Sequence, residues 1–198
     1  GGAGGGAGGG ASLETQAGHS AGVTAVAWQP RAHNYASAGN DMAVRLWAVG
    51  TPGATAVLRT DARVLSVAWS SSASSASSSS HVVAAGLESG AVRLWDVRAA
   101  GKGPIATISH HEGPVGALAF SPSSGLLASG GDDACVRVCD WAAAVSGGGG
   151  GGVEALSLGG HRDYVRALLW SGSRLLSAGW DKFLLQHTPV LDAAVAPA

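Results

Sequence analysis

The most regular feature of the chain is a six-residue apolar segment that begins with Val and ends with an aromatic residue. It occurs four times, as VTAVAW, VLSVAW, VGALAF and VRALLW at residues 23–28, 64–69, 115–120 and 165–170. Short apolar runs that recur along a chain are typical of β-strands in repeated modules. The pattern therefore predicts four β-modules that share an aromatic core position, occupied by Trp28, Trp69, Phe120 and Trp170.

Each module continues with two further short strands that are separated by a tight polar turn. Second strands are predicted at residues 35–39, 82–86, 126–130 and 174–179, and third strands at 44–49, 92–97, 136–141 and 183–188. The turns contain Asn40-Asp41, Glu88-Ser89-Gly90, Asp132-Asp133 and Trp180-Asp181. No helical periodicity lies between these segments, so the sequence predicts an all-β repeat array.

Three low-complexity tracts interrupt the array. We expect a disordered Gly-rich tail at residues 1–11, a Ser-rich loop at 70–80 and a Gly-rich loop at 146–152. Tracts of this composition cannot pack a core. Segments that resemble outer strands flank the modules at 12–17, 153–158 and 190–196.

Composition narrows the classes of function. Hydrophobic residues make up 46% of the chain, charged residues 13%, and the net charge is −1. Because the chain also lacks a Lys/Arg run, we expect no nucleic-acid partner and no membrane partner. No stretch approaches the roughly 18 apolar residues of a membrane span, and no signal peptide is recognisable, so an intracellular protein is expected.

The two cysteines give no sign of a metal site. Cys135 and Cys139 lie four residues apart in a predicted strand, which separates them by about 13 Å and excludes a disulfide between them. No second Cys or His pair at ligand spacing accompanies them. We therefore expect no metal and no cofactor.

The repeats resemble those of the WD-repeat family of β-propellers over about residues 12–198. The Gly-His pair that opens a repeat in this family is present at Gly18-His19 and Gly160-His161, while His110-His111 and Arg59-Thr60 hold that place in the other two copies. The closing Trp-Asp pair is intact only at Trp95-Asp96. The resemblance implies four blades, each of four antiparallel strands, with repeat starts near residues 19, 60, 111 and 161.

The resemblance also implies a hydrogen-bonded group within each blade. Its candidate members are His19, Ser37, Asp41 and Trp47 in the first copy, His111, Ser129 and Asp133 in the third, and His161, Ser177 and Asp181 in the fourth. Cys139 and His187 stand where the third and fourth copies would have Trp, and the second copy keeps only Trp95. Because one set of residue types recurs three times, we interpret it as structural and not as a hydrolase triad, and no catalytic residue is predicted. Arg45, Arg93 and Arg137 also recur, which favours a framework or solvent-facing role.

In this family the upper face of the propeller grips peptides or proteins. The implied contact residues include Arg63 and Glu88 in the second blade, Asp132 in the third, and Tyr164, Arg166 and Trp180 in the fourth. The fourth blade is distinctive, since Tyr, Arg and Trp are enriched at binding hot spots. We expect a scaffold or adaptor that binds a protein or peptide; the alternative is that Trp180 packs in the fold.

Two other functions are alternatives to a scaffold. Trp95, Asp96 and Arg98 resemble the box with which WD-repeat substrate receptors engage cullin-RING ubiquitin ligases, although Glu88-Ser89 departs from it. An enzyme would need convergent titratable groups apart from the repeats, and the sequence offers none. Because propellers of this family mostly close with more blades, we expect an open or incomplete propeller that pairs with missing blades or a second chain.

Overall fold

The chain folds into a row of four antiparallel β-sheets, which confirms the predicted all-β array of blades. The computed structural model describes residues 16–70, 81–146 and 154–189. The predicted tail 1–11, most of both loops, and the strand-like segment 190–196 lie outside these residues.

Three sheets have four strands, and each strand pairs with its neighbour in the sequence. The first sheet comprises β1 (Val23–Trp28), β2 (Asn34–Gly39), β3 (Ala43–Ala48) and β4 (Ala56–Arg59). The second comprises β5 (Val64–Trp69), β6 (Val82–Leu87), β7 (Ala91–Asp96) and β8 (Ala106–Ser109). The third comprises β9 (Val115–Phe120), β10 (Leu126–Gly131), β11 (Val136–Asp140) and β12 (Ala155–Leu158). In the fourth sheet, the described strands are β13 (Val165–Ser171), β14 (Arg174–Gly179) and β15 (Leu184–His187).

Two short helices lie between third and outer strands. A 3-10 segment, η2 (Val97–Lys102), follows β7, and α1 (Trp141–Ser146) follows β11. The third strand of the third module was predicted to run to Trp141, but it stops one residue earlier. The Asp140 carboxylate accepts hydrogen bonds from the N–H groups of Ala142 and Ala143 at 2.8 and 3.1 Å, and this capping starts the helix.

The sheets stack face to face, and their first strands lie along the inside of the stack. β1 contacts β5, β5 contacts β9, and β9 contacts β13. The Thr24 hydroxyl donates to the Val64 carbonyl at 2.6 Å, and the Ser66 hydroxyl donates to the Val115 carbonyl at 2.9 Å. Aliphatic side chains fill the spaces between sheets. Apolar burial between neighbouring sheets therefore holds the array together.

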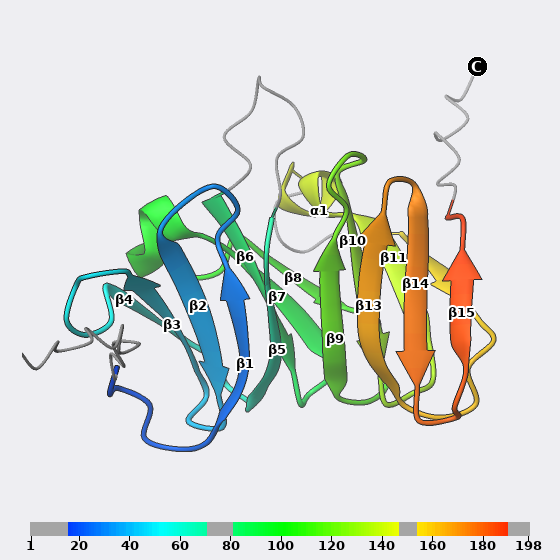
Figure 1. Cartoon of the computed structure of the whole chain (residues 1–198), viewed down its shortest axis with the longest axis horizontal. Coiled ribbons are helices and arrows are strands. Elements are labelled where there is room, and N and C mark those ends of the chain that lie inside the picture. The colour runs from blue at the N-terminus through cyan, green and yellow to red at the C-terminus, as the bar shows by residue number, and fades with distance from the viewer. Residues whose placement is uncertain (1–15, 71–80, 147–153, 190–198) are drawn as a thin grey trace, which may run out of the picture.

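The array is open, with the first and last sheets at opposite ends of Figure 1. This arrangement overturns one core prediction. Trp69, Phe120 and Trp170 are 6%, 9% and 8% exposed, as expected for core, but Trp28 is 57% exposed. Each buried ring packs against the preceding sheet, as when the Trp170 indole N–H donates to the Ala119 carbonyl at 3.0 Å. No sheet precedes β1 in the described part of the chain, so Trp28 instead stacks on Tyr35 at 5.5 Å.

Candidate functional site

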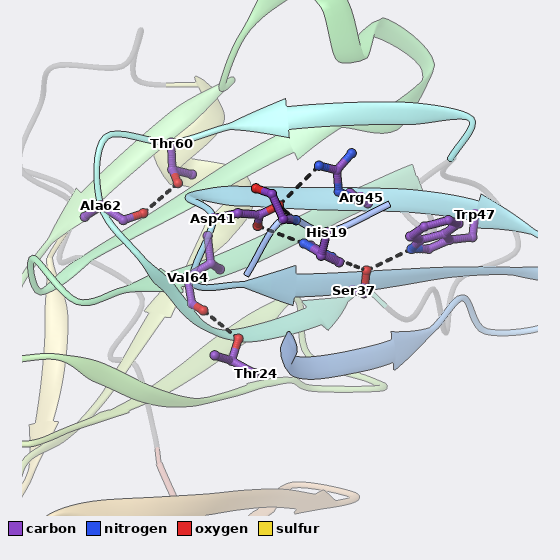
Figure 2. Close-up of polar contacts among 10 residues, drawn as sticks. His19, Thr24, Ser37, Asp41, Arg45, Trp47, Thr60, Ala62 and Val64 are labelled. Carbon is purple, nitrogen blue, oxygen red and sulfur yellow. Dashed lines mark hydrogen bonds and ion pairs between the residues drawn. The ribbon is translucent and has the colours of Figure 1, made fainter. Parts of the chain in front are cut away.

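The first blade joins all four predicted members of its hydrogen-bonded group. His19 Nδ1 lies 2.8 Å from Asp41 Oδ1, and His19 Nε2 lies 2.7 Å from Ser37 Oγ. The Trp47 indole N–H donates to the same Ser37 oxygen at 2.8 Å. Figure 2 shows His19 between Asp41 and Ser37, with Trp47 beyond Ser37. The group ties the segment before β1 to β2, the following turn and β3.

The donors and acceptors limit the arrangement of hydrogens in this group. An indole N–H can only donate, so Ser37 Oγ accepts from Trp47. His19 donates from Nδ1 to the Asp41 carboxylate, and the Ser37 hydroxyl can donate to Nε2 when the ring is neutral.

Asp41 is held in its ionised form. Burial raises the pKa of Asp41, but hydrogen bonds from His19, the Ser20 N–H and Arg45 outweigh burial, and the pKa lies below its ordinary value. Arg45 Nη2 lies 3.1 Å from Asp41 Oδ2, which gives this recurrent arginine a framework role. Arg137 pairs with Asp133 at 3.5 Å, while Arg93 pairs with Asp61 at 2.6 Å.

The third blade keeps the group without its tryptophan. His111 Nδ1 lies 2.9 Å from Asp133 Oδ1, and His111 Nε2 lies 2.8 Å from Ser129 Oγ. Cys139, at the tryptophan position, is 5% exposed within the second apolar cluster. Burial raises the pKa of the Cys139 thiol to about 12, so it remains protonated and acts as a packing residue.

The fourth blade replaces the tryptophan with a second histidine. His161 lies 2.8 Å from both Asp181 Oδ2 and Ser177 Oγ, and His187 Nε2 lies 2.8 Å from the same serine oxygen. His187 thus occupies the place of the indole N–H, a role that the sequence left unassigned. Burial, followed by the charge of His161, lowers the pKa of His187, which favours the neutral ring.

Glycine supports these groups at a position that the sequence analysis missed. A Cβ on Gly39, Gly131 or Gly179 would lie within 2.6 to 2.9 Å of both the histidine Nδ1 and the aspartate Oδ1 of its own blade. The signal was present in the sequence, since each of these glycines stands two residues after the group's serine and two before its aspartate. Only a residue without a side chain leaves room for the ion pair.

A second cluster lies at the turn between β14 and β15 of the fourth blade, the end that the family resemblance predicts to be the upper face. Its members are Asp132, Tyr164, Arg166 and Trp180, which we call the aromatic–arginine cluster. The Arg166 guanidinium carbon lies 4.9 Å from the centre of the Tyr164 ring and 4.5 Å from that of Trp180. Arg166 Nη1 lies 3.1 Å from Asp132 Oδ1, on the neighbouring blade. Trp180 is nevertheless 62% exposed, so the cluster fixes a large aromatic surface in contact with solvent.

The remaining partner candidates form an ion pair in the second blade. The Arg63 guanidinium donates to both carboxylate oxygens of Glu88, and the side chains are 51% and 39% exposed. The hydrogen bond from Arg63 lowers the pKa of Glu88. This pair belongs to a different blade from the aromatic–arginine cluster, and the described contacts do not join the two.

The candidate ligase residues are divided between core and surface. Trp95 is 1% exposed in the first apolar cluster, whereas Arg98 is exposed and bonded to the Asp96 carboxylate through Nε at 2.9 Å. That hydrogen bond lowers the pKa of Asp96. Contact with a ligase adaptor stays a prediction.

Two other classes of site have no counterpart in the described ranges. No group of three or more His, Cys, Asp or Glu side chains there could hold a metal ion. No helix in the same ranges is long and apolar enough to cross a membrane.

The repeated His–Ser–Asp groups and the stacked four-stranded blades define a propeller-type repeat protein. A family model described as WD domain, G-beta repeat matches residues 10–48 and 102–140. The chain therefore carries WD repeats, and the two that this model matches correspond to the first and third blades.

The known proteins that are similar to it include a curated relative and a solved structure. The Ribosome biogenesis protein WDR12 homolog of Nematostella vectensis is 31% identical over 179 residues, which make up 88% of this chain and 39% of that protein. The chain thus spans about two fifths of this relative's length. The crystal structure of the computationally designed Ika4 protein has a TM-score of 0.70 and 20% identity, and the match covers 90% of this chain and 98% of that one. This second likeness is one of fold.

Proposed function

We propose that this chain is a non-catalytic interaction module that binds a protein or peptide partner at the upper face of its fourth blade. The observation that carries the proposal is the exposed indole of Trp180, which Arg166 and Tyr164 hold in a fixed position. Large aromatic side chains bury much area on binding, and a side chain that is already ordered loses little entropy. The cluster therefore suits a binding hot spot.

The chain is similar to a ribosome biogenesis protein, and this similarity supports an intracellular partner that takes part in ribosome biogenesis. In this proposal the blades are the platform and the His–Ser–Asp groups stabilise it. Arg166 is already neutralised by Asp132, so we expect an apolar or aromatic side chain of the partner to contact Trp180.

Trp180→Ala tests the proposal. The whole chain is used as bait in a cell extract, and the recovered proteins are quantified by mass spectrometry. We expect Trp180→Ala to lower recovery of the specific partners by at least about tenfold, since hot-spot truncations cost about 2 kcal/mol or more. The thermal midpoint should stay nearly unchanged because the indole is mostly exposed.

Trp28→Ala is the matched control, because Trp28 is 57% exposed at the other end of the array. It should retain the partners. Unchanged recovery with Trp180→Ala, or a large loss of stability in that variant, would refute the assignment.

A further inference from the structure

The second blade lacks the aspartate that the other three blades place in the turn after their second strand. The first residue of this turn is identified in every blade by one hydrogen bond, from its N–H to the carbonyl of the residue before the first strand. These turn residues are Asn40, Glu88, Asp132 and Trp180, with distances of 2.9 to 3.0 Å. The next residue is Asp41, Asp133 or Asp181 in three blades. In the second blade it is Ser89.

The aspartates satisfy donors that surround this turn. In each of the three blades a carboxylate oxygen accepts from the backbone N–H that follows the histidine. The donors are Ser20, Glu112 and Arg162, at 3.1, 3.2 and 3.0 Å. In the first blade the same oxygen, Asp41 Oδ2, also accepts from Arg45, four residues further on, at 3.1 Å. The carboxylate thus pairs with an arginine as well as with an amide.

The second blade keeps both donors of this outer oxygen. Asp61 is the equivalent of Ser20, and no contact among the described residues gives its N–H an acceptor. Arg93 is the equivalent of Arg45 and stands four residues after Ser89. Its Nε is buried without a hydrogen-bond partner. Arg93 Nη2 donates instead to the Asp61 carboxylate at 2.6 Å, on a side chain that is 66% exposed.

The place of the inner carboxylate oxygen is filled in this blade. Leu87 stands where the other blades have glycine, and it is fully buried. A Cβ on the equivalent Gly39 would lie 2.6 Å from both His19 Nδ1 and Asp41 Oδ1, so a side chain at this position needs the space of that pair. Ser89 is exposed above Leu87. The second blade has therefore lost half of the carboxylate site and keeps the donors of the other half.

We propose that Ser89 is a phosphorylation site, and that its phosphoryl group takes the place of the missing outer oxygen. Transfer of the γ-phosphoryl group of ATP by a protein kinase replaces the O–H bond of Ser89 Oγ with an O–P bond, and ADP and a proton leave. The phosphoryl oxygens accept from Arg93 and from the Asp61 N–H, in charge-assisted hydrogen bonds. A phosphoserine side chain is longer than that of aspartate, which suits a site whose inner half is filled.

Phosphorylation would change the charge at this end of the second blade. Before modification the charges are balanced, since Arg63 pairs with Glu88 and Arg93 pairs with Asp61. A phosphoryl group carries nearly two negative charges at neutral pH and competes with Asp61 for Arg93. The exposed Asp61 carboxylate is then released, and the modified surface repels an acidic partner. This site is separate from the aromatic–arginine cluster and does not depend on that cluster's proposed role.

The acceptor role of Arg93 is tested on the whole chain with phosphoserine placed at position 89 during synthesis. Phosphorus NMR across a pH titration gives the pKa of the phosphoryl group. A control chain carries phosphoserine at position 123, an exposed serine with no arginine contact among the described residues. We expect the pKa at position 89 to be lower by about 1 than at position 123, because a paired guanidinium favours the charged form. Arg93→Gln should abolish the difference.

The modification itself is tested on the chain isolated, with phosphatase inhibitors, from the cells that make it. Mass spectrometry of its peptides should find phosphate on Ser89, and an unmodified Ser89 would overturn the proposal. Equal phosphoryl pKa values at positions 89 and 123, or a value at 89 that Arg93→Gln leaves unchanged, would overturn it too. Circular dichroism and thermal midpoints establish that each chain is folded. Trp180→Ala should leave the phosphoryl pKa unchanged, so the two proposals fail separately.

Discussion

At the scale of single residues, the repeated histidines serve the fold. Each is held between a serine and an ionised aspartate, and the same arrangement recurs in three blades. Recurrence at a fixed spacing is typical of a structural group, since a catalytic set is normally assembled once from different elements. The family resemblance predicted the serine and aspartate partners of these histidines. It could not predict that His187 would contact the Ser177 oxygen in place of a tryptophan, because that contact depends on where β15 places the His187 ring.

Asp41→Ala should destabilise the first blade. The His19 Nδ1–H would lose its acceptor at a side chain only 5% exposed, and an unsatisfied buried donor costs about 1–3 kcal/mol. Urea unfolding measures the loss. Asp163→Ala, at an aspartate outside these groups, is a suitable control. A stability equal to wild type would show that Asp41 has another role.

Acid should weaken the fold from near neutral pH downward. Burial lowers the pKa of His111, even though Asp133 opposes the effect, and burial also lowers the pKa of His187. The unfolded chain then binds protons more readily than the native chain, so this stability is present above about pH 6.5 and is lost as the pH falls through the native pKa values. The urea concentration at the unfolding midpoint should therefore decrease as the pH is lowered from 7 to 5.

The His187→Gln variant isolates part of this pH effect. Glutamine can still donate to Ser177 but does not titrate, so the pH dependence should become shallower. An identical dependence in wild type and His187→Gln would exclude His187 as a contributor.

At the scale of elements, the turns between second and third strands share a left-handed residue. Met42, Ala134 and Lys182 have φ values of 57°, 60° and 70°, and Gly90 has 88°. Only the second blade uses glycine, and there a Cβ would lie 2.4 Å from the His111 carbonyl oxygen. The turn sequences predicted tight turns, but the close approach between blades could not be inferred from local pattern.

Gly90→Ala should therefore cost more than an ordinary glycine replacement. Gly50 has a similar φ of 76°, but no atom lies within 4 Å of the place that a Cβ would take, so Gly50→Ala carries the conformational cost alone, about 1 kcal/mol. Gly90→Ala adds the clash with the His111 carbonyl. The free energies of unfolding of the two variants give the comparison, and equal losses would contradict the role of this contact.

At the scale of the whole molecule, the order of strands and blades followed from the sequence because alternation and turn residues are local signals. The solvent exposure of equivalent side chains could not be predicted from the sequence in the same way. Val23 is 54% exposed although Val64, Val115 and Val165 are fully buried at the same repeat position. All four residues have the same local sequence context, and only the neighbouring sheet distinguishes them. The arrangement of the aromatic–arginine cluster likewise required the contact between two blades.

The open stack also sets how the molecule comes apart. Among the described residues, the inner sheets have a neighbour on each side, whereas the first and last have one, as in a linear array whose stability is a sum over neighbouring units. Local opening should therefore begin at the ends and move inward. Native-state hydrogen exchange should show slower exchange for backbone amides of β6 and β10 than for those of β2 and β14. Uniform rates would mean that the four blades open as a single cooperative unit.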